Sequence, residues 1–268
     1  MIESNNSKGP CLLFVFFPPR SLSTIFLRTM MNNPNVVGFN DEFTRAHIED
    51  NMPKGGKVPP EELVKEVEIQ IEKTLKDGKT VIFKDTGDFT ITFFEDILKK
   101  WNTKFNTKFM YLVRHPLTTY VSFKQKMDHE INELKRFPLE WLLERLNMDY
   151  YTSLLKLYEV FGGKVVISED LQENPTKVFK EIYDYCGLEF KEELLTFKPL
   201  IQEGLPKRWE FLKHFYDECF NSTTLRAGVT DMSKLVVEDK EVLEQIKIRE
   251  EVYNKLKEVR KNQLDEVK

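Results

Sequence analysis

The chain has little cysteine and no long apolar run. Its 268 residues include only Cys11, Cys186 and Cys219, which are too few and too scattered for a disulfide framework or a zinc site. We therefore expect buried thiols in a reducing compartment. No apolar segment approaches the roughly 20 residues that a helix needs to cross a bilayer. The first ten residues are polar and carry an acid, unlike the start of a signal peptide. These features predict a cytoplasmic protein without a membrane span, in which residues 1–9 form a flexible N-terminus.

The chain also lacks an excess of positive charge. Its net charge is −4 at pH 7 and its isoelectric point is near 5.8. A general nucleic-acid or anionic-membrane binder would be basic, so we expect no nucleic-acid partner. Any anion site must be a local cluster of cations. The length and an apolar content of 41% predict one large α/β domain over residues 1–268. No feature of the sequence indicates an oligomeric state.

Two glycine-rich phosphate loops are missing as well. The string G-x-x-x-x-G-K-[ST], whose glycines let the backbone wrap a triphosphate, occurs nowhere, and neither does G-x-G-x-x-G. The paired glycines Gly55 and Gly56 precede Lys57 but follow no predicted strand. A triphosphate or dinucleotide site built on these motifs is therefore excluded.

What the chain does have is a strand that leads into a hydroxyl-rich turn and then a helix, over residues 12–31. The apolar run Leu12–Phe17 is typical of a parallel strand buried on both faces. Arg20, Ser21, Ser23 and Thr24 follow it and open an apolar helical pattern. The free N–H groups and the dipole of a helix N-terminus favour an anion there. In the alternative interpretation, the hydroxyls only cap the helix. These residues alone leave both open.

Similar strands recur between helical patterns along the chain. The predicted strands are 12–17, 36–39, 80–85, 108–116 and 164–171. The predicted helices include 61–76, 116–127, 138–161, 175–186 and a charged helix over 236–266, within a C-terminal segment 233–268. This alternation predicts an α/β fold with a mostly parallel, doubly wound sheet flanked by helices.

Cations follow three of the five predicted strands. The residues at the strand ends are Arg20 and Ser21, Asp41 and Glu42, Lys84 and Asp85, Arg114 and His115, and Ser168 and Glu169. In such a sheet, ligands bind outside the carboxyl ends of the strands. Three cations there predict a site for a polyanion. The alternative is that strand ends are polar because they meet water. We interpret Glu169 and Asp170 as structural residues.

Four segments resemble motifs of sulfotransferases that use 3′-phosphoadenosine 5′-phosphosulfate (PAPS). Residues 18–27, PPRSLSTIFL, resemble the 5′-phosphosulfate loop P-[KR]-[ST]-G-[ST]-[ST]. Residues 111–123, YLVRHPLTTYVSF, resemble the 3′-phosphate motif, an Arg with a Ser eight residues later. Residues 225–234, LRAGVTDMSK, are similar to the late loop R-x-G-x-x-x-[WM], and residues 168–188 are similar to a strand-E-D-L-x-x-x-P-helix segment. The resemblance covers about residues 10–232, in family order.

The resemblance implies a P-loop NTPase-like fold, PAPS as the donor and a small-molecule hydroxyl or amine as the acceptor. The implied donor contacts are Ser21, Leu22, Ser23 and Thr24 at the 5′-phosphosulfate, with Arg20 near the bridging oxygen, and Arg114, Ser122, Arg226, Ala227 and Gly228 at the 3′-phosphate. No metal is implied. Two positions depart from the family: Leu22 replaces the usual Gly of the loop, which restricts its backbone, and Ile25 replaces a Trp that stacks on adenine in some members.

The general base is the remaining assignment. Many members place a His two residues after a strand-end Lys, but Lys84 is followed by Asp85 and Thr86. Other branches use a Glu about twenty residues after the basic residue of the loop, and Glu42 stands 22 residues after Arg20. We therefore predict Glu42 as the base, with Arg20 and Lys84 stabilising charge, and keep Asp41 and Asp85 as alternatives. The alternative interpretation of Glu42 is a first-turn helix acid that the helix dipole stabilises.

Three functions fit these residues. The first is a PAPS-dependent sulfotransferase. The second is a non-catalytic module that binds a nucleotide phosphate, which the missing His and Leu22 favour. The third and weakest is a small-molecule kinase that uses ATP. The segments expected to shape an acceptor pocket, 43–60 and 128–145, show no theme that identifies the acceptor.

Overall fold

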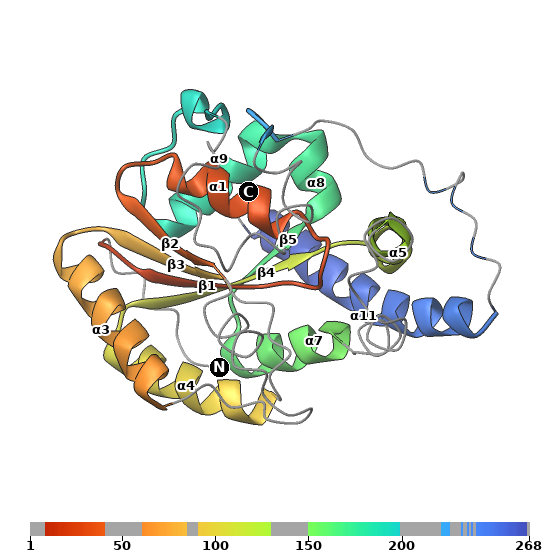
Figure 1. Cartoon of the computed structure of the whole chain (residues 1–268), viewed down its shortest axis with the longest axis horizontal. Helices are drawn as coiled ribbons and strands as arrows, with labels where there is room; N and C mark the ends of the chain where they lie inside the picture. The colour runs from red at the N-terminus through yellow and green to blue at the C-terminus, as the bar shows by residue number, and fades with distance from the viewer. Residues whose placement is uncertain are drawn as a thin grey trace.

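The computed structural model describes residues 9–40, 61–84, 91–129, 150–198, 221–225, 232, 235, 237 and 240–266. Five strands of these ranges form one sheet with helices on both faces (Figure 1). The strands are β1 (Leu12–Phe16), β2 (Val36–Asn40), β3 (Thr80–Lys84), β4 (Thr107–Val113) and β5 (Lys164–Ile167).

The sheet is parallel throughout, with the order β2-β3-β1-β4-β5. Strand β1 lies at the centre, and the chain builds β2 and β3 on one side of it before it builds β4 and β5 on the other. The strand order therefore reverses beside β1, which is where open α/β sheets bind ligands. This confirms the predicted α/β fold with a parallel, doubly wound sheet.

The apolar run of β1 is buried because both of its faces are covered. Side chains alternate along a strand, so Leu12, Phe14 and Phe16 join one core cluster while Leu13 and Val15 join the other. All five are at most 6% exposed. The run is hydrophobic without interruption because each face of the strand packs into its own core.

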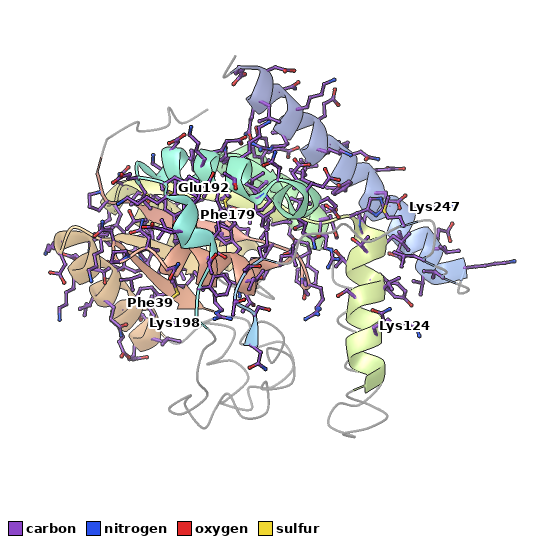
Figure 2. The ribbon with its side chains drawn as sticks, turned by 90° about the horizontal axis from the view of Figure 1, so that it is seen from above. Phe39, Lys124, Phe179, Glu192, Lys198 and Lys247 are labelled. Atoms are coloured by element: carbon purple, nitrogen blue, oxygen red, sulfur yellow. The ribbon has the colours of Figure 1, made fainter. Side chains whose placement is uncertain are left out.

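The helices divide between the two faces, as Figure 1 shows. The first core includes side chains of α3 (Glu61–Lys76), α4 (Ile91–Lys104), α7 (Tyr150–Phe161) and α11 (Lys240–Asp265). The second includes side chains of α1 (Ser23–Met31), α8 (Ser168–Glu173) and α9 (Pro175–Cys186). Figure 2 labels Phe179 of α9, whose ring stacks on that of Phe26 in α1. Helix α5 (Pro116–His129) follows β4, and a short 3-10 helix, η2, covers Glu192–Leu195.

Three predicted boundaries are wrong by three residues or more. Strand β4 ends at Val113, whereas the predicted strand runs to residue 116. Strand β5 ends at Ile167, and the next residue begins α8, so the predicted strand 164–171 is half helix. The acids Glu169 and Asp170 stand in the first turn of α8, where the helix dipole stabilises negative charge. The C-terminal helix begins at Lys240 rather than at residue 236.

Proline-based helix starts are confirmed. Pro116 is the first residue of α5 and Pro175 the first of α9. Before Pro175, the side chain of Asn174 accepts a hydrogen bond from the backbone N–H of Lys177, which caps the helix.

Helix α11 closes the edge of the sheet at β5. The Gln263 side chain accepts a hydrogen bond from the Val165 backbone N–H at 3.1 Å and donates one to the Gly163 carbonyl at 2.7 Å. This amide therefore takes the place of a neighbouring strand at two backbone groups that would otherwise be open to pairing. The guanidinium of Arg260 lies one turn earlier on α11 and contacts Glu181 of α9 at 2.6 Å.

The described residues also bear on the expectations for membrane spans, metal sites and cysteines. Among the described residues, no helix is both long and apolar enough to cross a membrane, and no group of His, Cys, Asp and Glu side chains has the arrangement of a metal site. Cys11 and Cys186 are buried free thiols, as predicted, whereas Cys219 lies outside the described ranges. The division of the chain into a single domain stays a prediction.

Candidate functional site

The site is built around the loop between β1 and α1. Leu22 is the N-cap of α1, and its carbonyl accepts the first helical hydrogen bond, from the N–H of Phe26. No side chain caps this helix, so the interpretation in which serines and threonine serve as caps is wrong for α1. The first N–H groups of a helix have no partner within it. The helix therefore presents the kind of N-terminus at which anions bind.

Two residues of this loop have left-handed backbone conformations. Arg20 has φ of 65° and Leu22 has φ of 69°. This region costs a residue with a Cβ about 1–2 kcal/mol, and glycine avoids the cost. Leu22 therefore adopts the conformation that the usual Gly of the loop would adopt freely. The predicted restriction of the backbone at this position is real, and the surrounding structure must hold it.

Side chains from two neighbouring strand ends hold the loop. Arg114, directly after β4, donates from Nη1 to the Arg20 carbonyl at 2.7 Å. Ser168, directly after β5, donates from its buried hydroxyl to the Ser21 carbonyl at 2.8 Å. These bonds fix two successive carbonyls on one side of the loop. They explain how the strained conformation persists without glycine.

Arg114 is a buried cation whose direct partner is neutral. The residue is 8% exposed, and burial lowers the pKa of its guanidinium, a shift that the charge of Glu169 opposes. Within the described ranges, no carboxylate forms an ion pair with it, and its buried Nε has no hydrogen-bond partner. The buried hydroxyl of Ser21 is also unpartnered among these residues. Buried polar atoms are usually satisfied. Unpartnered buried donors also occur at Arg260, so what distinguishes Arg114 and Ser21 is their place beside the N-terminus of α1, where an anion could accept from them.

The structure brings the two segments that resemble phosphate motifs into direct contact. The Nε of Arg20 donates to the hydroxyl of Ser122, on α5, at 3.3 Å. Arg20 was predicted at the bridging oxygen of the donor, and Ser122 at its 3′-phosphate. With Arg114 bonded to the Arg20 backbone, all three predicted residues belong to one hydrogen-bonded group.

Lys84 lies on the other side of β1 from Arg114. It is the last residue of β3, in register with Val15 of β1, and is only 1% exposed. Its ammonium lies 4.7 Å from the centre of the Phe17 ring, a cation–π distance. Arg20, Lys84 and Arg114 thus all lie at the carboxyl edge of the parallel sheet, as predicted.

The turn after β4 is held by two residues to which the sequence assigned no role at the site. The hydroxyl of Tyr151, on α7, donates to the Arg114 carbonyl at 2.6 Å. Burial raises the pKa of this tyrosine, so the hydroxyl stays a donor. Glu169 accepts a hydrogen bond from the backbone N–H of His115 at 3.0 Å. The position of Glu169 after a strand was visible in the sequence, whereas nothing near Tyr151 signalled its contact.

Ser23 and Thr24 are the first two residues of α1. The other predicted residues lie outside the described ranges. They are Asp41, Glu42, Asp85, Arg226, Ala227 and Gly228. The residue before Arg226 is described: Leu225 is buried in the same core cluster as Ile25 of α1. On the outer side of α1, Arg28 donates to the Lys198 carbonyl at 2.9 Å (Figure 2 labels Lys198). The segments on both sides of residues 199–220 therefore pack against α1.

Comparison with known proteins bears on the fold. No protein-family model matches the chain, and no curated protein matches its sequence. The sulfotransferase domain of the olefin synthase of Synechococcus PCC 7002 is similar in structure, with a TM-score of 0.53 and 21% identity over 92% of this chain and 96% of that one. The sulfotransferase domain of the curacin biosynthetic pathway has a TM-score of 0.52 and 18% identity, over 89% of this chain and 97% of that one. The chain therefore has the α/β fold of sulfotransferase domains.

Proposed function

We propose that this protein is a sulfotransferase that moves a sulfuryl group from PAPS to a hydroxyl or amine of a small-molecule acceptor. The observation that carries the proposal is the pair of unpartnered buried donors, Arg114 Nε and Ser21 Oγ, at the carboxyl edge of the sheet. Both residues belong to segments that resemble nucleotide-binding motifs of sulfotransferases. A phosphate supplies both the negative charge and the acceptor atoms that such donors need.

The 3′-phosphate of the nucleotide would be held by Arg114 and Ser122, together with Arg226 and the backbone of Ala227 and Gly228. Support for this assignment comes from the hydrogen-bonded group that already joins Arg114, Arg20 and Ser122. Hydrogen bonds to charged groups contribute about 1.5–3 kcal/mol each. Three or four of them supply about the free energy of micromolar binding, before ordering costs.

The 5′-phosphosulfate would lie at the N-terminus of α1. Ser21, Ser23 and Thr24 would donate hydroxyl hydrogen bonds there, and the backbone N–H groups after Leu22 would add theirs. PAPS, when bound, supplies the activated sulfuryl group. The chain contributes a loop whose carbonyls are tied down by Arg114 and Ser168, so that its N–H groups need little reorganisation on binding.

Lys84 and Arg20 would stabilise the charge that develops on oxygens during transfer. Preorganised cations at a poorly hydrated site act on such charge most strongly, and removal of one such donor costs about 2.7–4 kcal/mol in the transition state. The burial of Lys84 supports this role. We expect Arg20→Ala and Lys84→Ala to reduce the transfer rate more than donor affinity.

Glu42 is the proposed general base. Strand β2 ends at Asn40, which is in register with Lys84, and Glu42 follows two residues later in the sequence. We expect Glu42→Gln to leave donor binding intact and to slow transfer to an alcohol by about 10²–10⁴-fold. Asp41→Asn and Asp85→Asn are the matched controls. A dead Asp85→Asn beside a near wild-type Glu42→Gln would move the role to Asp85.

The function is tested by two measurements on the purified chain. Titration calorimetry compares adenosine 3′,5′-bisphosphate with ATP, and a radiolabelled-sulfate assay then screens phenols, alcohols and amines as acceptors. Binding of the bisphosphate together with transfer supports the proposal. Binding without transfer to any acceptor class favours a non-catalytic nucleotide-phosphate module, and a preference for ATP favours a kinase.

A further inference from the structure

Glu169 lies at the site with its position fixed. It stands in the first turn of α8, immediately after β5, and its Oε1 accepts the hydrogen bond from the His115 N–H at 3.0 Å. The hydroxyl of Thr118, on α5, lies 3.4 Å from the same oxygen. His115 directly follows Arg114, so Glu169 is anchored to the turn that carries the proposed phosphate-binding arginine.

The second oxygen of this carboxylate differs from the first in its hydrogen bonding. Glu169 Oε2 is buried and accepts no hydrogen bond from the described residues. Tyr253 of α11 interacts with this carboxylate through its hydroxyl, and burial, the charge of Glu169 and this interaction raise its pKa. Helix α11 packs against α5, and Figure 2 shows it crossing that helix near Lys247. The helix thus helps to keep the negative charge of Glu169 away from solvent.

Arg114 needs such a charge nearby. A buried cation without an anion is costly, and the direct partner of Arg114 is the neutral Arg20 carbonyl. Among the described groups, the charge of Glu169 favours the charged form of Arg114 and opposes the lowering of its pKa by burial. It does so from beyond ion-pair distance, so it compensates the charge without occupying the guanidinium.

We propose that Glu169 is the resident counter-charge of Arg114, and that a bound phosphate works against it. This inference rests on the proposed function. The carboxylate stabilises the site when no nucleotide is bound, and it repels the 3′-phosphate when one is. Glu169 is therefore a positioning residue that limits the affinity for the nucleotide and speeds the release of the bisphosphate product.

Glu169→Gln separates charge from shape. The amide keeps an oxygen for the His115 N–H and nearly the same volume, while it loses the charge and replaces the second oxygen by an NH2 group. Asp170→Asn is the matched control, because it removes an equal charge from the neighbouring residue of α8, which lies beside Arg260. Each variant is titrated calorimetrically at pH 8 with adenosine 3′,5′-bisphosphate and with adenosine 5′-monophosphate, which lacks the 3′-phosphate. Melting temperatures are measured in phosphate-free buffer and over a series of inorganic phosphate concentrations.

We expect Glu169→Gln to bind the bisphosphate about three- to tenfold more tightly than wild type, because a like charge near the phosphate is gone. Binding of the monophosphate should change less than twofold. In phosphate-free buffer the variant should melt below wild type, and the deficit should shrink as inorganic phosphate rises. Asp170→Asn should change neither nucleotide preference nor the response to phosphate.

Equal or weaker bisphosphate binding by Glu169→Gln, or an equal gain in Asp170→Asn, would overturn the inference while leaving the proposed function in place. If wild type binds no bisphosphate but phosphate still rescues the variant, the proposed function fails and the counter-charge stands. A second measurement covers poor folding of the variant: in an Arg114→Met background, Glu169→Gln should no longer destabilise the protein. A loss of stability as large as in wild type would reject the role.

Discussion

Arg114 and Arg260 are both buried arginines, yet their surroundings differ. Arg260, on α11, is 3% exposed and contacts the Glu181 carboxylate at 2.6 Å, with Asp170 at 3.9 Å. Arg114 is 8% exposed, and its hydrogen bond goes to a backbone carbonyl. The first cation has its anions within the protein. Arg114 holds the loop before α1 and, among the described residues, has no ion-pair partner.

The two arginines contrast a cation that is paired within the protein with one that we propose to bind a ligand. An internal ion pair with Glu181 ties α11 to α9, although the buried Nε and Nη1 of Arg260 make no hydrogen bond within the described residues. Arg114 stays buried at some cost in free energy, which a bound phosphate would offset. Hydrogen bonds from Tyr151 and Ser168 also hold the turn after β4 and the loop before α1. Several hydrogen bonds that fix the backbone around one buried cation are typical of a preorganised binding site.

The largest expected effect is at Arg260. Arg260→Ala removes a buried side chain and leaves Glu181, among the described residues, with only its more distant partner Lys164, at 3.5 Å, so we expect the free energy of unfolding to fall by about 3 kcal/mol. Urea denaturation measures this loss. Bisphosphate affinity of the folded fraction should stay within twofold of wild type. A variant that keeps its stability but loses the nucleotide would remove the distinction between the two arginines.

Arg114→Ala should show the reverse pattern. We expect bisphosphate binding to weaken by about 2–4 kcal/mol, since a phosphate charge loses its partner. The free energy of unfolding should change by less than in Arg260→Ala, because no ion pair is broken. Calorimetry and urea denaturation on the same sample measure both. Wild-type affinity in this variant would contradict the assignment of the 3′-phosphate site.

A third charged cluster joins α3 to α4 and gives a pH test of an internal ion pair. Burial alone would raise the pKa of Glu68, but hydrogen bonds from Lys100, Lys104 and Trp101 lower it to about 2. Because the folded-state pKa is below the unfolded one, this stability is present above about pH 4.5 and is lost as the pH falls toward 2.

We expect Glu68→Gln to cost about 1–2 kcal/mol at pH 7 and little at pH 2, with partial screening of the exposed lysines. Urea denaturation from pH 7 to pH 2 checks this. If the difference between wild type and variant does not depend on pH, then Glu68 is not held as an ionised partner.

The smallest expected effect is at Ser168. Ser168→Ala removes the hydrogen bond to the Ser21 carbonyl, and we expect a loss of about 1 kcal/mol in stability. The more informative readout is binding, since a looser loop should weaken the bisphosphate without changing the charge of the site. A Ser168→Ala variant with unchanged affinity would show that the loop does not depend on this anchor.

Much of the fold could be predicted because its signals are local. The apolar run of β1, the proline starts of α5 and α9 and the strand–helix alternation each rest on neighbouring residues. The cations Arg20, Lys84 and Arg114 were placed at one edge by the same reasoning, since parallel strands end on the same side. The boundary at Ser168 was missed because KVVISEDL reads as a continuous strand until the acids are seen as a first helical turn.

The contacts between distant segments could not be predicted. Arg20 meets Ser122 across 102 residues, and Tyr151 reaches the Arg114 carbonyl from α7 across 37. From the sequence we interpret Glu169 as structural. Its proposed role as the counter-charge of Arg114 follows only from the burial of Arg114, which the sequence does not reveal. None of these relations leaves a periodicity or motif in the sequence, since each depends on how the helices pack around the sheet edge.

The central claim is that the carboxyl edge of this sheet binds a nucleotide with a 3′-phosphate. Titration calorimetry of wild type with adenosine 3′,5′-bisphosphate, against adenosine 5′-monophosphate and ATP, tests it most directly. We expect micromolar binding of the bisphosphate. The two other nucleotides should bind at least about tenfold more weakly, a difference of about 1.4 kcal/mol in binding free energy. Equal affinity for the monophosphate, or tighter binding of ATP, would contradict it.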